Sequence, residues 1–208
     1  MALSNYSDLQ TSVASWLNKS NLSSSIPDFI ALAEADINRR LRLQSMEQVG
    51  TGSTSSATID LSSVLTRWAK IKSVTVNDAS TYWILNYVSP QQFWQRHATS
   101  FQAVPEDYTL VGDTLRFGPT PDTSYTWTIW YFQKVEPLST AGTNTILTNH
   151  PDIYLYGSLV AAEPFLKNDA RLQTWKLLYE SAMAAAQQES NTDRVGGTSA
   201  QTSEMGVI

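Results

Sequence analysis

Residues 108–167 constrain the fold of this chain more than any other segment. Residues 125–132 have the two-residue period of a β-strand, and one face carries Tyr125, Trp127, Ile129 and Tyr131. The other face begins with Thr126 and Thr128 and continues with Trp130 and Phe132, so the strand ends apolar on both sides. A helix that is apolar on both sides follows from Pro151, because proline is well suited to the first helical turn. A strand and a helix of this kind both need cover on two sides. We therefore predict that a sheet meets a helical bundle in this segment.

The segment between residues 49 and 140 reads as an inserted antiparallel β region. Residues 108–117 form a predicted hairpin, in which Gly112 supplies the positive φ of a tight turn. Residues 57–61, 71–76 and 82–87 also read as strands. By contrast, the Gly/Ser/Thr-rich residues 50–56 are typical of a linker or a long loop.

Helical patterns lie on both sides of the β region. A capping-box pattern begins at Ser7, Pro27 opens a second helix that is expected to reach Met46, and Asp169 is expected to cap the last helix. We predict an α+β fold, a four-helix bundle formed by the N- and C-terminal helix pairs with the β region inserted. Its parts are residues 1–48, 49–140 and 141–190, followed by an extended tail at residues 191–208.

Composition excludes several classes of function. Only 16% of the 208 residues are charged, the net charge is −5, and there are seven Trp, nine Tyr and six Phe. An acidic chain is poorly suited to nucleic-acid binding by phosphate neutralisation. The absence of cysteine excludes disulfides and thiolate-zinc sites. Neither a signal peptide nor an apolar membrane span is expected.

Reactive side chains do not cluster along the sequence. His97 and His150 have no ligand partner at metal-binding spacing, so neither a metal nor a cofactor is expected. Glu163 is the acid with the best chance of burial, and nothing in the sequence brings it to His97. We therefore expect a protein that is not an enzyme.

Contacts with other proteins explain the many aromatic residues and the arginine cluster better than catalysis or metal binding does. An apolar stripe with Phe29, Leu32 and Leu43 meets either a neighbouring subunit or the β region of the same chain. Arginines 39, 40 and 42 form either a solvated face or charge pairs across an interface. The complete set of interface candidates is Phe29, Leu32, Arg39, Arg40, Arg42, Trp68, Trp94, Val195, Met205, Val207 and Ile208.

Several segments together resemble a known family. They include IPDFIALAEADINRRLR at residues 26–42, YTLVGDTLRFGPTP at residues 108–121 and PDIYLYGSL at residues 151–159. Their order and spacing resemble head-to-tail adaptor proteins of tailed bacteriophages over about residues 5–190.

The resemblance implies a non-enzymatic ring, typically of twelve copies, beneath the portal protein. Such a ring extends the DNA channel without binding DNA specifically, and it docks the next tail protein, a nozzle or a tail tube. It is assembled in the host cytoplasm, becomes part of the virion and needs no membrane. The tail is a candidate for contact with the portal. The alternative is a virion carbohydrate-binding module that uses exposed aromatic residues, with Trp68 and Trp94 as its best candidates.

Overall fold

The chain folds into two compact units, each with its own core. The computed structural model describes residues 3–18, 22–99, 101–166 and 171–195. The first unit comprises Met1–Ser45 and Val135–Ile208, and the second comprises Met46–Lys134. The predicted α+β class is confirmed, since helices make up most of the first unit and strands most of the second.

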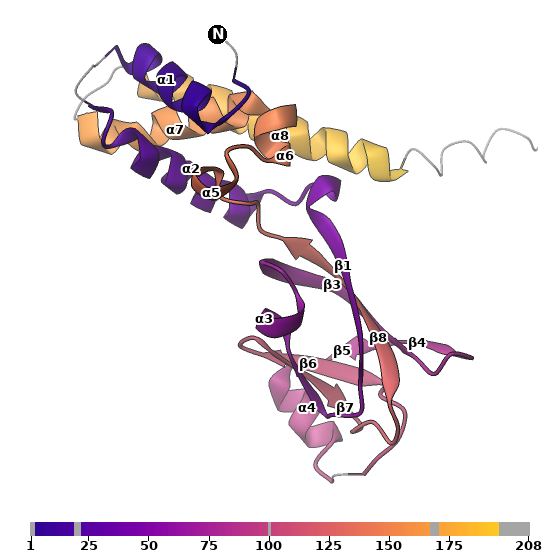
Figure 1. Ribbon diagram of the computed structural model, residues 1–208. Helices are drawn as coiled ribbons and strands as arrows, with labels where there is room; N and C mark the ends of the chain where they lie inside the picture. Colours follow the sequence, from indigo (N-terminus) through magenta and orange to yellow (C-terminus); the bar gives the residue numbers. More distant parts are fainter. Residues whose placement is uncertain (1–2, 19–21, 100, 167–170, 196–208) are drawn as a thin grey trace, which may run out of the picture. The chain divides into compact units, whose positions relative to one another are not determined.

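The first unit is built around one helix. Its helices are α1 (Tyr6–Leu17), α2 (Ile26–Arg40), α5 (Leu138–Ala141), α6 (Thr145–Asn149), α7 (Pro151–Leu166) and α8 (Leu172–Val195). Helix α7 packs against α1, α2, α6 and α8 (Figure 1). The helices from the two ends of the chain therefore share one core.

The sequence of α7 explains its central place. Apolar residues surround it, so Ile153, Tyr154 and Leu159 are fully buried. Gly157 lets α2 and α8 approach closely, because a Cβ there would lie 3.2 Å from the Cβ of Ala33 and 3.0 Å from the Tyr179 ring. Close packing of this kind on several sides leaves only residues near the two ends of α7, Asp152, Pro164 and Phe165, exposed.

Two helix boundaries differ from the sequence predictions. The cap of α1 is Asn5 rather than Ser7, since the Asn5 side chain accepts a hydrogen bond of 2.9 Å from the Asp8 N–H. Helix α2 ends at Arg40 instead of continuing to Met46, and a 3₁₀ turn, η2, occupies Gln44–Met46. Asp169, the predicted cap of α8, lies outside the described residues.

Side chains of α8 explain the early end of α2. Gln187 accepts a hydrogen bond of 3.1 Å from the Arg42 N–H, and the Ser190 hydroxyl accepts one of 2.7 Å from the Gln44 N–H. These tertiary hydrogen bonds replace the helical ones of the backbone N–H groups. Helix α2 can therefore end here although no glycine or proline stops it.

Side chains of α2 bind the chain where it re-enters the first unit. Asn38 Oδ1 accepts a hydrogen bond from the Val135 N–H, and Glu34 Oε1 accepts one from the Leu138 N–H, both at 2.8 Å. Burial raises the pKa of Glu34. Both ends of the inserted β region are thus anchored by hydrogen bonds inside the first unit.

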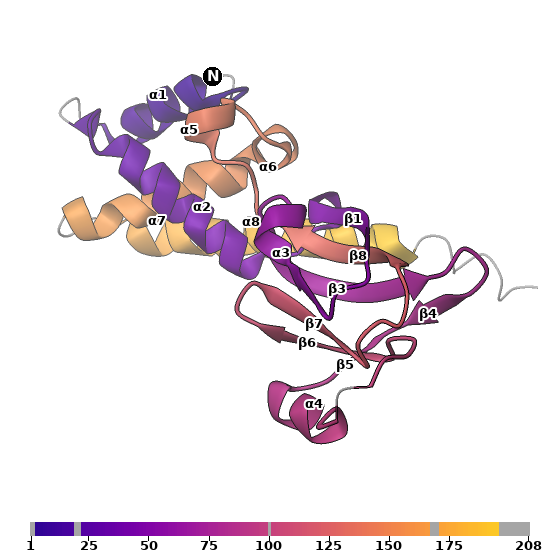
Figure 2. The ribbon, with the colours of Figure 1, turned by 60° about the horizontal axis from the view of Figure 1, so that its bottom comes forward.

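The second unit is a pair of four-stranded sheets. The first sheet has the order β1-β8-β3-β4 and the second β2-β7-β6-β5 (Figure 2). The strands are β1 (Glu47–Thr54), β2 (Thr58–Asp60), β3 (Trp68–Asn77), β4 (Tyr82–Ile84), β5 (Asn86–Tyr87), β6 (Asp107–Val111), β7 (Thr114–Gly118) and β8 (Tyr125–Gln133). Two short helices, α3 (Leu61–Val64) and α4 (Pro90–Arg96), complete the unit.

Residues of both sheets form one apolar core in this unit, with Val74, Leu115 and Ile129 fully buried. The predicted hairpin is confirmed as β6 and β7, and Gly112 has a φ of +59°. The prediction of a wholly antiparallel region is wrong, because β5 pairs with β6 in parallel. Residues 82–87 were expected to form one strand, but Leu85 separates two strands that belong to different sheets.

Residues 50–56 are not a linker, because β1 pairs with β8 along residues 47–54. Its glycines make room for large side chains of the core. A Cβ on Gly50 would lie 2.1 Å from Leu65, and one on Gly52 would lie 2.4 Å from the Trp127 ring. A composition typical of flexible loops therefore forms a strand here because Leu65 and Trp127 cover it.

Replacing Gly52 with alanine should destabilise the second unit. The added methyl group overlaps the Trp127 ring, and overpacking of this kind costs about 1–3 kcal/mol. The measurement is thermal or urea unfolding of the full chain. Thr51→Ala, on the exposed side of the same strand, is the control and should change stability by less than about 0.5 kcal/mol. Equal stability of G52A and the wild type would contradict this packing.

Candidate interaction surfaces

The described residues contain no group of three His, Asp or Glu side chains that could hold a metal ion. No helix in the described ranges is long and apolar enough to cross a bilayer. His97 and Glu163, the best enzyme candidates from the sequence, lie in different units. The candidate functional sites considered below are therefore surfaces that could contact other molecules.

His97 has a structural partner that the sequence did not reveal. Its Nε2 lies 3.1 Å from Oδ2 of the buried Asp107, and Nη1 of Arg96 lies 3.2 Å from the same oxygen. Gly118 leaves room for the imidazole, since a Cβ there would lie 2.5 Å from the ring. These contacts tie the end of α4 to β6 in the second sheet.

The arginine cluster divides into three different roles. Arg40 donates to both carboxylate oxygens of Glu180, one of them at 2.9 Å, and it also donates to Asp36. Arg42 lies beyond the end of α2, a correction to its predicted place on the helix, and its guanidinium donates to the carbonyls of Asn38 and Leu41. Arg39 is 71% exposed, so it is the most accessible of the three to a partner.

The Arg40 contacts join α2 to α8. The hydrogen bonds from Arg40 hold the pKa of Glu180 below its usual range. The Tyr179 hydroxyl donates to Asp36 at 2.9 Å, and burial followed by this hydrogen bond raises the pKa of Tyr179. Two helices far apart in the sequence are thereby fixed in register by a polar network at the edge of the core.

The predicted apolar stripe of α2 separates into a buried and an exposed part. Phe29 is 4% exposed and its ring lies edge-on to Phe165, with the centroids 5.8 Å apart. Leu43 is also buried. Leu32 is 57% exposed and stays available for contact with another protein.

The two tryptophan candidates lie in different environments. Trp94 is 52% exposed, but one side of its ring faces the guanidinium of Arg116, which lies 4.7 Å from the ring centroid. Trp68 is half-buried against the core of the second unit. Val195 is the last residue of α8, so residues 191–195 are helical and the predicted extended tail is wrong there. Met205, Val207 and Ile208 lie outside the described residues.

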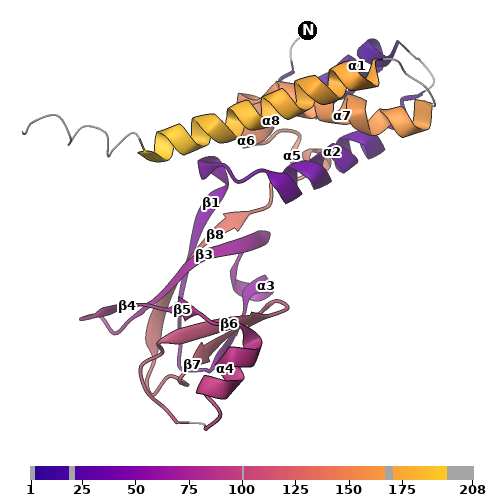
Figure 3. The ribbon, with the colours of Figure 1, turned by 180° about the vertical axis from the view of Figure 1, so that it is seen from behind.

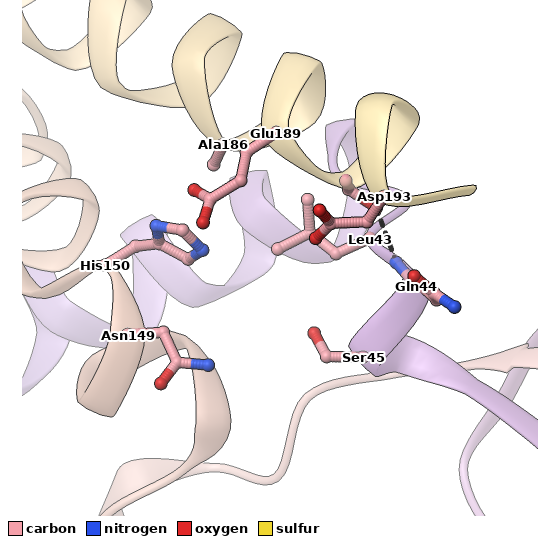
Figure 4. Close-up of a pocket in the computed structure, with 9 residues that line it drawn as sticks. Leu43, Gln44, Ser45, Asn149, His150, Ala186, Glu189 and Asp193 are labelled. Carbon is pink, nitrogen blue, oxygen red and sulfur yellow. Dashed lines mark hydrogen bonds between the residues drawn. The ribbon is translucent and has the colours of Figure 1, made fainter. Parts of the chain in front are cut away.

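An acidic hollow of about 550 Å³ lies in the first unit between the end of α6, the residues before β1 and the last turns of α8. It is lined by His150, Glu189 and Asp193, with polar groups of Ser45 and Asn149 beside them. Figure 4 shows the carboxylate of Glu189 and the ring of His150 facing each other. Two carboxylates in a hollow suit a cationic side chain such as arginine or lysine. Sequence patterns missed this hollow because its residues come from three separate segments.

The outer face of the first sheet carries four exposed apolar residues, Val49, Tyr82, Ile84 and Trp130, with threonines between them. Val49 lies directly opposite Trp130 in the β1–β8 register, and both are more than 40% exposed. Tyr82 and Ile84 are 72% and 75% exposed. The second sheet differs, since α4 packs against β6 there and buries Phe93. Large apolar residues exposed on one sheet face suit contact with another protein.

The Arg40–Glu180 pair should contribute measurably to stability. We expect a coupling free energy of about 1 kcal/mol or less from a double-mutant cycle with R40Q and E180Q, because both side chains are partly exposed. Since the pKa of Glu180 is lowered in the folded chain, the coupling should be complete above about pH 4.5 and disappear as pH falls through the lowered pKa.

The matched control for this cycle is R39Q. Arg39 is more exposed and its closest oxygen, on Asp36, lies 3.8 Å away, so stability should change little. Zero coupling between Arg40 and Glu180 at pH 7 would contradict the network.

Comparison with protein families gives one match. A family model described as SU10 adaptor protein matches residues 4–201. The search of curated proteins gave no match. The match includes both units and all the surfaces described above.

Proposed function

The chain belongs to the SU10 adaptor protein family, and from this we propose that it is a structural head-to-tail adaptor of a phage virion. The observation that carries the proposal is the match over nearly the whole chain. In this role the protein is not an enzyme. It joins other components of the virion instead.

In finer detail, we propose that about twelve copies form a closed ring beneath the portal protein, as the resemblance to head-to-tail adaptors implies. The ring extends the DNA channel and docks the next tail protein. Helices α1, α2, α7 and α8 act as a four-helix bundle that gives each copy a rigid body. The net charge of −5 supports a conduit role, because an acidic wall does not hold passing phosphates.

Two described surfaces suit the neighbouring proteins of such a ring. The outer face of the first sheet offers Trp130 and Ile84 for apolar contact. The acidic hollow offers Glu189 and Asp193 to a basic side chain. Residues 196–208, which include Met205, Val207 and Ile208, are proposed to bind the portal.

The carbohydrate-binding alternative has less support. A sugar-binding platform needs an open aromatic face. Arg116 covers one side of Trp94, and Trp68 is half-buried in the core of its unit. One face of Trp94 is therefore covered, and Trp68 offers little open surface.

The full-length chain should co-assemble with the portal protein of the same phage. Native mass spectrometry of the two purified proteins should show a complex with many adaptor copies on each portal ring. A catalytic assay is not needed to interpret the result. Failure to form this complex over a range of salt concentrations would overturn the proposed function.

Removing residues 196–208 should weaken portal binding at least tenfold and leave the fold intact, because α8 ends at Val195. Binding is measured by pull-down or light scattering, and the fold by circular dichroism. A control chain keeps the same length but has M205S, V207S and I208S. This control should lose affinity as well if the apolar residues make the contact. Full affinity of both variants would contradict the role of the tail.

A further inference from the structure

The solvent-facing side of α8 has an unusual composition. Its outer face is defined here by Leu177, Leu178, Ser181, Ala184, Ala185 and Gln188, all of which are exposed. They repeat at intervals of three and four residues, so they form one stripe along the helix. Leu177 is 71% exposed at the N-terminal end of the stripe. None of the six carries a charge.

Charged residues of α8 lie on the borders of this face. Lys176, Glu180 and Glu189 are placed by the helical repeat between the outer face and the buried side of Trp175 and Ala186. A helix on the surface of a soluble protein normally presents charged residues directly outward. On α8 the charged residues instead lie between two uncharged sides, as expected for a helix that is covered on both. The chain itself covers only one of these sides.

Helix α1 has a matching outer face. Ser7, Thr11, Ala14 and Ser15 lie on its solvent side, opposite the buried Leu9. The helix has a single charged residue, Asp8, whose carboxylate binds Asn5 and Ser4 at the helix start. The outer face of α1 is therefore small and uncharged, as the outer face of α8 is.

Helix α2 gives the contrast within the same unit. Its exposed residues combine the apolar Ala31, Leu32 and Ala35 with the charged Asp28, Arg39 and Arg40. An uncharged partner on this side would remove water from the highly exposed Arg39 without adding a charge that pairs with it, which is costly. Among the long helices of the described chain, α1 and α8 are thus the two whose outer faces suit each other.

We propose that the outer face of α8 binds the outer face of α1 in a second copy of this chain. The inference rests on the proposed function, because it specifies the contact between neighbouring copies in the ring. Helix α8 lies in front of α7 in Figure 3, and α1 lies beyond it, so the two faces belong to different sides of the unit. A contact between two different faces continues from copy to copy, which is what a ring requires.

The dimensions and side chains of the two faces agree. Helix α1 has 12 residues, about 18 Å of helix, and α8, with 24 residues, is long enough to contact all of it. Ser181, Ala184 and Ala185 are small enough for two backbones to approach closely. Leu177 and Leu178 provide the apolar area that a new contact buries.

Cysteine cross-linking tests the contact directly, because the chain has no cysteine of its own. The double variant T11C/S181C is assembled, with portal protein present if assembly requires it, and treated with a short bismaleimide. A ladder of covalent oligomers is expected on denaturing gels. A mixture of T11C and S181C chains should give dimers, and each single variant alone should give monomers.

The control pair is A31C/S181C, which places the first cysteine on the exposed, charged side of α2 and should give no ladder. Dimers from S181C alone would mean that α8 meets α8, and this would overturn the proposal. A double variant that joins the portal but stays monomeric after cross-linking would overturn it as well, while the adaptor function would stand. Wild-type protein that neither self-associates nor binds portal would overturn both.

A charge placed on the face gives an independent test. A184E should weaken self-association at least tenfold, because the carboxylate would be buried against an uncharged face. A35E introduces the same change at an exposed alanine of α2 and should leave association unchanged. Circular dichroism confirms that both variants fold. Equal association of A184E and A35E would contradict the proposed contact.

Discussion

The packing of three helices around α7 is the constraint on which the rest of the structure depends. Because α7 is apolar on every side, it is stable only when covered by α1, α2 and α8 together. The N-terminal helices must therefore meet the C-terminal ones. This requirement makes the β region an insertion. In both of its connections, backbone N–H groups donate hydrogen bonds to side chains of α2 or α8.

The packing around α7 also determines which surfaces of the chain remain available for contact with other proteins. Helix α7 is exposed only near its two ends, so most of the surface available for other proteins belongs to the covering helices and to the second unit. Arg40, which pairs with Glu180 inside the chain, is used mainly for stability. The outer faces of α1 and α8, the acidic hollow and the outer face of the first sheet are left for partners. The proposed adaptor role requires several such surfaces, because in that role the protein contacts its own copies and two different neighbours.

Sequence patterns predicted the elements whose signal is local. The hairpin at Gly112 and the apolar helix from Pro151 were both found in this way. Strand β1 was missed because its glycines resemble a linker, and only the Trp127 ring packed over Gly52 makes a strand of them. The end of α2 was missed for a similar reason, since Ser190, far along the chain, supplies the hydrogen bond that replaces a helical one. Surfaces made from distant segments, such as the hollow at His150, have no local signal at all.

The central claim is that this chain forms a ring on the portal through contacts between different helices of neighbouring copies. The most direct test is an electron cryo-microscopy structure of the adaptor bound to the portal protein. We predict a closed ring in which α8 of each copy lies against α1 of the next. A ring in which the outer faces of α1 and α8 are both open to solvent would contradict this account, as would an adaptor bound to the portal as isolated single copies.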